Sequence, residues 1–142
     1  MSSLSFPDIN VWLALATVEH VHARVARAWW KQEDGRIAFL RFTQLGLLRL
    51  MTTAAAMDGK PLSVNEAWRV HDRFFSDDRV EFVPEAPRSE ERFRKLAAGR
   101  GASPKIWADA WLLAAAQAAG GLVVTFDRAL EVRGALCLLP VD

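Results

Sequence analysis

The sequence predicts an α/β protein, a three-layer α/β/α sandwich around a central, mainly parallel sheet of about five strands. Short β-rich runs alternate with helical patterns along the whole chain, which is typical of a parallel sheet with helices on both faces. The 142 residues are 51% hydrophobic, and a chain of about 150 residues can bury about 68–70% of the surface that it exposes when unfolded. We therefore expect residues 1–142 to form one domain with a compact core.

The N-terminal part is expected to contain two strands separated by two helices. Residues 4–6 form a short apolar stretch that reads as a buried strand, and a helical pattern begins at residue 11. Apolar residues spaced three or four apart predict a second helix over residues 19–32, with Gly35 as its stop signal. Residues 36–42 are rich in β-favouring side chains and are expected to form the second strand.

The middle of the chain shows two helix starts. Thr43 stands where an N-cap is expected, ahead of an apolar helix face over residues 45–51. Residues 58–61 have the composition of a turn. Residues 63–66, Ser-Val-Asn-Glu, form a capping box for a helix that ends near residue 75.

The C-terminal part continues the alternation. A charged surface helix is expected over residues 88–98, and the glycine-containing stretch 99–104 after it is expected to be a mobile loop. The remaining expected elements are a helix over 106–119 and strands over 79–83, 122–126 and 136–139.

Composition excludes several classes of protein. Eighteen basic and seventeen acidic residues give a net charge of +1, which argues against a globally basic nucleic-acid surface but leaves a local patch open. Cys137 is the single cysteine, so neither an internal disulfide nor a cysteine-based zinc site is expected. Residues 1–10 do not resemble a secretory signal, and the most apolar run, 107–126, is interrupted by polar residues and glycines. We expect a soluble, cytoplasmic protein without a membrane partner.

Three aspartates stand out by their positions. Asp8 and Asp127 each follow a predicted strand, and Asp109 lies in the first turn of the helix before the later strand. From Asp109 that helix rises by about 16 Å, and the strand that ends at Asp127 returns by about 16–20 Å. If the first strand runs parallel to the later one, all three carboxylates meet in the crevice at the carboxyl ends of the strands.

Each aspartate also has a plain structural interpretation. Asp8 is a possible N-cap, Asp127 a possible Asx-turn residue and Asp109 a first-turn acid that favours the helix dipole. The meeting of three acids at one edge favours function instead. Asn10 and Thr125 are expected to support the site, although a turn or packing role fits them equally well.

Three converging carboxylates repel one another unless a cation lies between them. Their hard oxygen ligands select Mg²⁺ or Mn²⁺, and Mg²⁺ is commonly bound together with substrate phosphates. The chemistry that this arrangement predicts is metal-assisted hydrolysis of a phosphodiester.

At these residues the chain resembles PIN-domain ribonucleases of the VapC toxin type. The resemblance covers essentially the whole chain in order and spacing. The pieces that form it are Pro7-Asp-Ile-Asn-Val-Trp12, Phe42-Thr-Gln-Leu-Gly-Leu-Leu-Arg-Leu50, Trp107-Ala-Asp-Ala-Trp-Leu-Leu-Ala-Ala115, Val124-Thr-Phe-Asp127 and, loosely, His22-x-x-x-Ala26-x-x-x-Trp30.

The resemblance implies a PIN-like fold, acid-bound Mg²⁺ or Mn²⁺ and cleavage of RNA. It also implies a homodimer and a cognate VapB antitoxin that blocks the site with a C-terminal segment. Asp8, Asp109 and Asp127 match the first, third and fourth acids of the family. As catalytic residues they would hold the metal, Asp109 directly or through water.

One departure concerns the second acid of the family, a Glu early in the helix after the second strand. This neighbourhood reads Thr43-Gln-Leu-Gly46 and has no acid. We expect Gln44 or water to take its place, and we favour an active enzyme with three carboxylates.

Contact with RNA requires cations near the acids. Lys105 and Arg128 are placed for phosphates and Arg41 and Arg49 are secondary candidates, although solvated surface is the ordinary role of all four. His20 and His22 fall on the second predicted helix, where we expect surface or boundary positions rather than catalysis.

The apolar helix 45–51 and its neighbours are expected to offer the antitoxin a groove, from which an Arg of the antitoxin enters the acidic pocket. Two other functions remain open. One is a degenerate PIN domain that binds RNA or a protein without cleaving, which the missing Glu suggests. The other is a phosphatase or receiver-type domain, which is disfavoured because Ile9 and Asn10 follow Asp8 where a second aspartate is expected.

Overall fold

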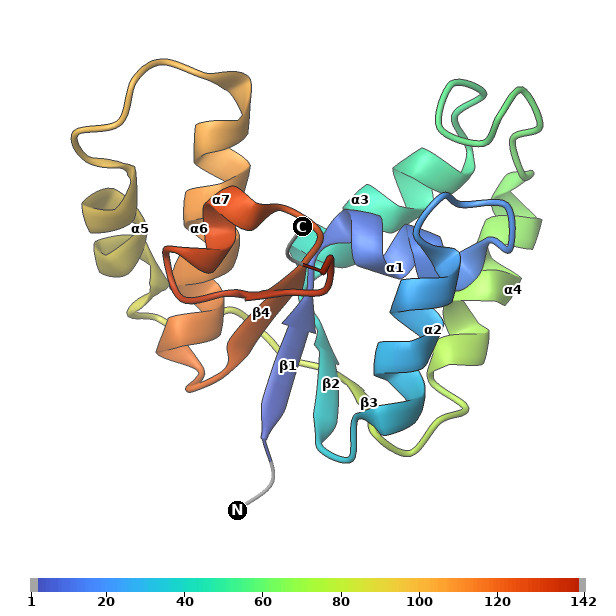
Figure 1. The fold of residues 1–142 in the computed structure, drawn as a ribbon, viewed down its shortest axis with the longest axis horizontal. Helices are drawn as coiled ribbons and strands as arrows, with labels where there is room; N and C mark the ends of the chain where they lie inside the picture. The colour runs from blue at the N-terminus through green and yellow to red at the C-terminus, as the bar shows by residue number, and fades with distance from the viewer. Residues whose placement is uncertain (1–2, 141–142) are drawn as a thin grey trace.

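The computed structural model of the protein describes residues 3–140 (Figure 1). All pairings in its central sheet are parallel, and the strands lie in the order β3-β2-β1-β4-β5. The strands are β1 (Leu4–Pro7), β2 (Arg36–Phe39), β3 (Val80–Phe82), β4 (Leu122–Thr125) and β5 (Leu136–Cys137). This topology confirms the predicted parallel sheet.

Helices cover both faces of the sheet, which confirms the three-layer architecture (Figure 1). Ile37 and Phe39 of β2 pack with the helices of one face, and the alternate residue Ala38 packs with those of the other. The first face carries α1 (Ile9–Ala16), α2 (Ala23–Gln32), α3 (Arg41–Met51) and α4 (Val64–Phe74), and the second carries α5 (Ser89–Ala97), α6 (Pro104–Ala118) and the short α7 (Arg128–Glu131).

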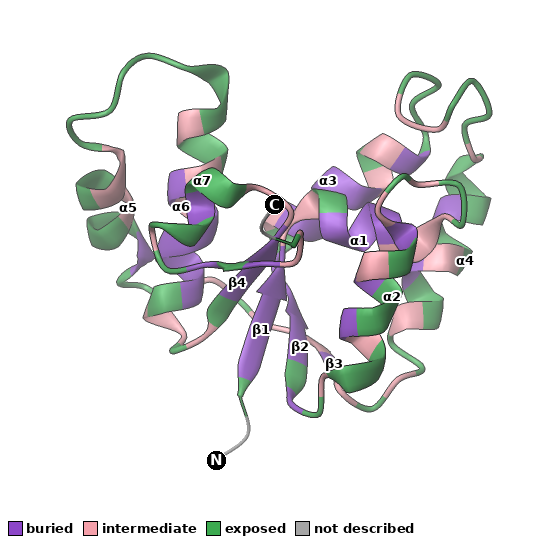
Figure 2. Cartoon of the chain, viewed as in Figure 1, coloured by how far each residue is buried: buried purple, intermediate pink, exposed green. Residues whose placement is uncertain are grey.

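Burial follows this layering closely. The strands are mostly buried, whereas the outward faces of the helices are exposed (Figure 2). Trp12 of α1 is fully buried and stacks on Phe39, with 3.7 Å between the ring centroids. The first helix is thereby fixed against the sheet directly after Asp8.

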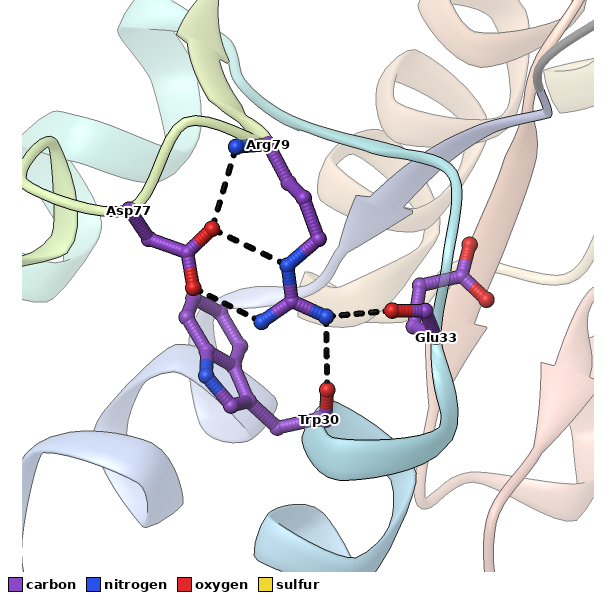
Figure 3. A network of polar contacts seen from close by, with 4 residues as sticks. All are labelled: Trp30, Glu33, Asp77 and Arg79. Carbon is purple, nitrogen blue, oxygen red and sulfur yellow. Dashed lines mark hydrogen bonds and ion pairs between the residues drawn. The ribbon is translucent and has the colours of Figure 1, made fainter.

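Arg79 ties the C-terminal end of α2 to the loop before β3 (Figure 3). Its guanidinium donates to both carboxylate oxygens of Asp77 and to the backbone carbonyls of Trp30 and Glu33. It also lies 4.7 Å from the centroid of the Trp30 ring. A planar cation with several donors therefore satisfies carbonyl groups that the helix end leaves free.

Several predicted boundaries differ from the structure. The second strand ends at Phe39 and α3 begins at Arg41, so the prediction of Thr43 as N-cap is wrong. Leu40 is the N-cap, and the Thr43 hydroxyl one turn later accepts a hydrogen bond from its N–H at 3.0 Å. Leu40 is buried like the strand residues before it, although it stands at the start of α3. The apolar run over 36–42 therefore resembles one continuous strand.

The second helix begins at Ala23, not at residue 19. The His22 N–H donates to the ring Nδ1 of His20, a local bond that competes with helix formation. The capping box of Ser63 and Glu66 is confirmed by both of its hydrogen bonds, at 2.9 and 3.1 Å. Within residues 3–140, no helix is both long and apolar enough to cross a bilayer.

Candidate active site at the carboxyl edge of the sheet

Pairing of β1 with β4 places Asp8 beside the end of β4. Pro7 is in register with Val124, and the Asp8 N–H donates to the Val124 carbonyl at 2.9 Å. The Asp8 carboxylate also caps α1, because Oδ1 accepts from the Val11 N–H at 3.0 Å. Asp127 similarly caps α7 by accepting from the Ala129 N–H at 2.9 Å. The capping role and a role in the site therefore coexist, since each cap bond uses one oxygen.

Thr125 connects the two strand ends. Its hydroxyl donates to Asp8 Oδ2 at 2.5 Å and accepts from the Asp127 N–H at 3.0 Å. The residue is fully buried, so water does not compete for these bonds. Thr125 thus orients one acid through its side chain and the other through its backbone.

Asp109 lies in the second turn of α6, because this helix begins at Pro104 and not at residue 106. Its distance from the helix N-terminus weakens the interpretation of Asp109 as a first-turn acid. Burial raises the pKa of Asp109, and the negative charge of Asp127 raises it further, while Lys105 and Arg133 oppose the shift.

The pKa of Asp8 is also raised. Burial is the main cause, and the charge of Asp109 adds to it, while hydrogen bonds from Thr125 and from the backbone of Val11 and Asn10 oppose the shift. Both shifts mean that the local environment disfavours negative charge in the absence of a cation.

The three acids line one cavity of about 440 Å³. Lys105 borders the same cavity, with its Nζ 4.0 Å from Asp127 Oδ2. The complete lining consists of Asp8, Asn10, His20, His22, Lys105, Asp109, Phe126, Asp127 and Leu130. The structure therefore brings together the three predicted acids, Asn10 and one predicted cation.

The side chains fit a hard divalent cation in chemistry but are not closed around one. Over residues 3–140, no three Asp, Glu, His or Cys side chains lie close enough together to hold a single ion. Mg²⁺ commonly binds through one or two carboxylates and keeps several water molecules. Burial, and to a smaller extent repulsion between the acids, raises the pKa of Asp8 and of Asp109, and a cation would offset both effects. The cavity of about 440 Å³ has room for the waters of such a cation.

Gln44, one of the two expected replacements for the family Glu (the other being water), lies outside this cavity. It is buried in α3, where its Oε1 accepts from Arg41 and its Nε2 lies 3.2 Å from Nε2 of His71. His71 in turn contacts Asp72 at 2.8 Å. A buried amide has to satisfy its polar atoms locally, and these contacts direct Gln44 towards α4.

The other predicted cations also lie outside the cavity. Arg41 lies over the ring of Phe82, with its Cζ 4.7 Å from the centroid. Arg128 is exposed and donates to the Leu139 carbonyl at 3.0 Å, and Arg49 is exposed on α3. Of the four cations predicted from the sequence, Lys105 is the one that borders the acids.

His20 and His22 are half-buried, as expected for boundary residues, but they lie before α2 rather than on it and they line the cavity. A signal was available in the topology. A helix that leads into a parallel strand begins at the carboxyl edge of the sheet, and α2 leads into β2. The residues just before α2 are therefore expected beside the strand ends.

The sequence model of the PIN domain family matches residues 5–135. This chain belongs to the PIN domain family. Curated relatives include Ribonuclease VapC41 from two strains of Mycobacterium tuberculosis, CDC 1551 and H37Rv. Each is 39% identical over 135 residues, which are 91% of this chain and 92% of the relative. The PIN domain described here is therefore of the VapC type.

Solved structures agree with this PIN fold. VapC20 of M. tuberculosis, described as a Sarcin-Ricin loop cleaving toxin, superposes with a TM-score of 0.66 at 14% identity, covering 93% of this chain and 96% of the other. VapBC2 of Rickettsia felis, bound to a DNA fragment from its promoter, gives a TM-score of 0.63 at 13% identity, covering 94% and 96%. At these identities the likeness concerns the fold.

Proposed function

We propose that this PIN domain is the toxin of a VapBC pair and that it hydrolyses RNA phosphodiester bonds at the acidic cavity with Mg²⁺ or Mn²⁺. The observation that supports this most directly is the placement of Asp8, Asp109 and Asp127 around one cavity. The identity of 39% to a VapC ribonuclease over 91% of the chain supports the same activity.

In this proposal Asp8 and Asp127 hold the divalent ion, and Asp109 assists directly or through water. When bound, the ion supplies Lewis-acid polarisation of the phosphate and lowers the pKa of water. The Thr125 hydroxyl holds Oδ2 of Asp8 in place. Backbone N–H groups at the starts of α1 and α7 hold Oδ1 of Asp8 and Oδ1 of Asp127. These bonds preorganise the acids before the ion arrives.

Hydrolysis adds the oxygen of a water molecule to phosphorus and breaks one P–O bond, and the departing oxygen takes up a proton. Lys105 is placed to neutralise a phosphate oxygen, because it lies at the cavity rim beside Asp127. Arg41, Arg49 and Arg128 are more distant candidates for the RNA backbone, and all three are exposed.

A VapB-type antitoxin is the proposed partner. The expected docking surface on the apolar helix 45–51 needs revision, because Leu47 and Met51 are fully buried in the core. A cavity of about 570 Å³ between α1, α2 and α4 offers a groove instead. It combines apolar residues such as Leu15, Val70 and Phe74 with the charged Arg27 and Arg73, a composition that suits an amphipathic segment.

The test of the proposed activity uses the purified protein, structured RNA and either Mg²⁺ or Mn²⁺. We expect cleavage by the wild type and its loss in Asp8→Asn. Asp58→Asn is the matched control, because Asp58 is exposed and lies outside the cavity. Equal behaviour of wild type and Asp8→Asn with both metals would contradict the nuclease and leave a non-cleaving PIN domain. Light scattering on the same preparation tests the proposed homodimer.

A further inference from the structure

Part of the acidic cavity is lined by aromatic rings. His20, His22 and Phe126, here called the aromatic wall, border the cavity together with the three acids. The ring centroid of Phe126 lies 4.7 Å from that of His22 and 6.0 Å from that of His20, and the two histidines are 5.8 Å apart. All three rings are half-buried, so each retains accessible surface.

The geometry of the wall is held by backbone contacts. The His22 N–H donates to Nδ1 of His20 at 3.0 Å, which leaves Nε2 as the protonated nitrogen of the neutral ring. Burial lowers the pKa of His20, with a smaller effect from His22, and so favours that neutral ring. Phe126 is positioned between Thr125 and Asp127, whose bond at 3.0 Å fixes the strand end. Phe126 therefore belongs to the same peptide segment as Asp127, whereas the two histidines come from the loop before α2.

Core packing does not account for the two histidine rings, whereas Phe126 packs partly against the core and is also part of the cavity lining. The inward contacts at the start of α2 are made by the buried Ala23 and Ala26, whereas His20 and His22 lie before the helix and face the cavity.

We propose that the aromatic wall stacks on one unstacked base of the RNA next to the cleaved phosphate and thereby selects the cleavage position. This inference rests on the proposed function. Proteins bind unpaired RNA bases mainly by stacking them on Phe, Tyr, Trp or His rings. A volume of about 440 Å³ lies within the range of about 300–1,000 Å³ usual for ligand pockets. The three acids line the same cavity as the wall, so a phosphate bound at the proposed metal site would lie in the cavity that the wall borders.

The first experiment measures binding without cleavage. Single-stranded RNA with 2-aminopurine at successive positions is titrated with the protein in Ca²⁺ in place of Mg²⁺, because Ca²⁺ is also bound by carboxylate oxygens. We expect quenching at one position in the wild type, together with a loss of quenching and about a 10-fold weaker Kd in His22→Leu and Phe126→Leu. His22→Phe keeps the ring and is expected to bind like the wild type. Phe93→Leu is the matched control, because Phe93 packs on Trp107 and Trp111 outside the cavity.

The second experiment maps the cleavage sites of the same variants with Mg²⁺. If the wild type cleaves and His22→Leu and Phe126→Leu cleave at the same positions with the same KM, the aromatic wall does not select the cleavage position. The proposed nuclease activity then stands. Absence of cleavage by the wild type overturns the proposed function. The quenching experiment then tests only whether the aromatic wall stacks on an RNA base. Unchanged RNA binding with weakened binding of a VapB peptide also overturns the inference, because it assigns the wall to a protein partner. Circular dichroism confirms that each variant is folded.

Discussion

The Thr125 hydroxyl donates a hydrogen bond to Asp8 Oδ2 at 2.5 Å, although 117 positions separate the two residues in the sequence. The same hydroxyl accepts from the Asp127 N–H. One buried side chain therefore sets the position of two acids that come from different strands.

Replacing Thr125 with Val tests this relationship, because Val has nearly the same shape but lacks the hydroxyl. We expect Thr125→Val to lower RNA cleavage at least about 10-fold and to destabilise the fold by about 1–3 kcal/mol, since Asp8 loses a buried donor. Thr125→Ser keeps the hydroxyl and should retain most of the activity. Wild-type rates in Thr125→Val would show that the bond does not orient the acids. Cleavage rates and urea unfolding provide the measurements.

Asp8 is expected to cost stability when no cation is bound. Because burial raises its pKa, the ionised form is disfavoured in the folded state, and stability decreases as the pH rises through that pKa. Asp8→Asn removes the charge but can still cap α1. We therefore expect Asp8→Asn to have a higher Tm than the wild type at pH 7 in EDTA. The increase should be roughly 2–4 °C for each 1 kcal/mol gained in the free energy of unfolding.

Addition of Mg²⁺ should reverse the order of the two Tm values, so that the wild type becomes more stable than Asp8→Asn. An ion that binds only the folded state raises the Tm of the wild type with increasing concentration, whereas Asp8→Asn should respond weakly. Thermal denaturation over a Mg²⁺ series measures both effects. The same Mg²⁺ response in both proteins would argue against Asp8 as a ligand, and Asp58→Asn serves again as the control.

Gln44→Glu tests whether restoring an acid to α3 restores a metal ligand. The side chain is directed towards Arg41 and His71, away from the acidic cavity. We expect an ion pair with Arg41 and an unchanged number of bound Mn²⁺ ions in calorimetric titration. An additional bound ion would show that the side chain can turn towards the acids.

Arg79→Lys tests the contacts at the end of α2. Lysine cannot reproduce the paired bonds to Asp77 together with those to two carbonyls, so we expect a loss of about 2 kcal/mol. Hydrogen bonding to Arg79 lowers the pKa of Asp77. Its ionised form therefore stabilises the fold at neutral pH, and this contribution is lost as the pH falls below about 4. The Tm difference between wild type and Arg79→Lys should narrow in acid, whereas a constant difference would exclude a role of the Asp77 charge.

The sequence was sufficient to predict the sheet and the acids because both depend on regular geometry. Alternation of elements fixes a parallel sheet, and strand ends of such a sheet share one edge, which is why Asp8 and Asp127 were predicted as neighbours. The α7 helix was missed because it has only four residues and is started by the Asp127 cap, which leaves no periodic pattern to detect.

The remaining differences come from tertiary contacts. Gln44 lies in the stretch where the resemblance implies a Glu, but the orientation of its side chain depends on His71, which lies 27 residues away. Likewise, His20 and His22 looked like helix residues because a local bond between a ring and a backbone N–H has no signature in hydrophobic spacing. Side-chain direction at a known position was the least predictable quantity.

The pairing of β1 with β4 has a consequence for synthesis of the protein. Ribosomes synthesise a chain from its N-terminus, so Asp8 emerges more than a hundred residues before Thr125 and Asp127. A chain that terminates before Asp127 therefore lacks part of the acidic cluster. Under the proposed function, such an incomplete chain is expected not to cleave RNA.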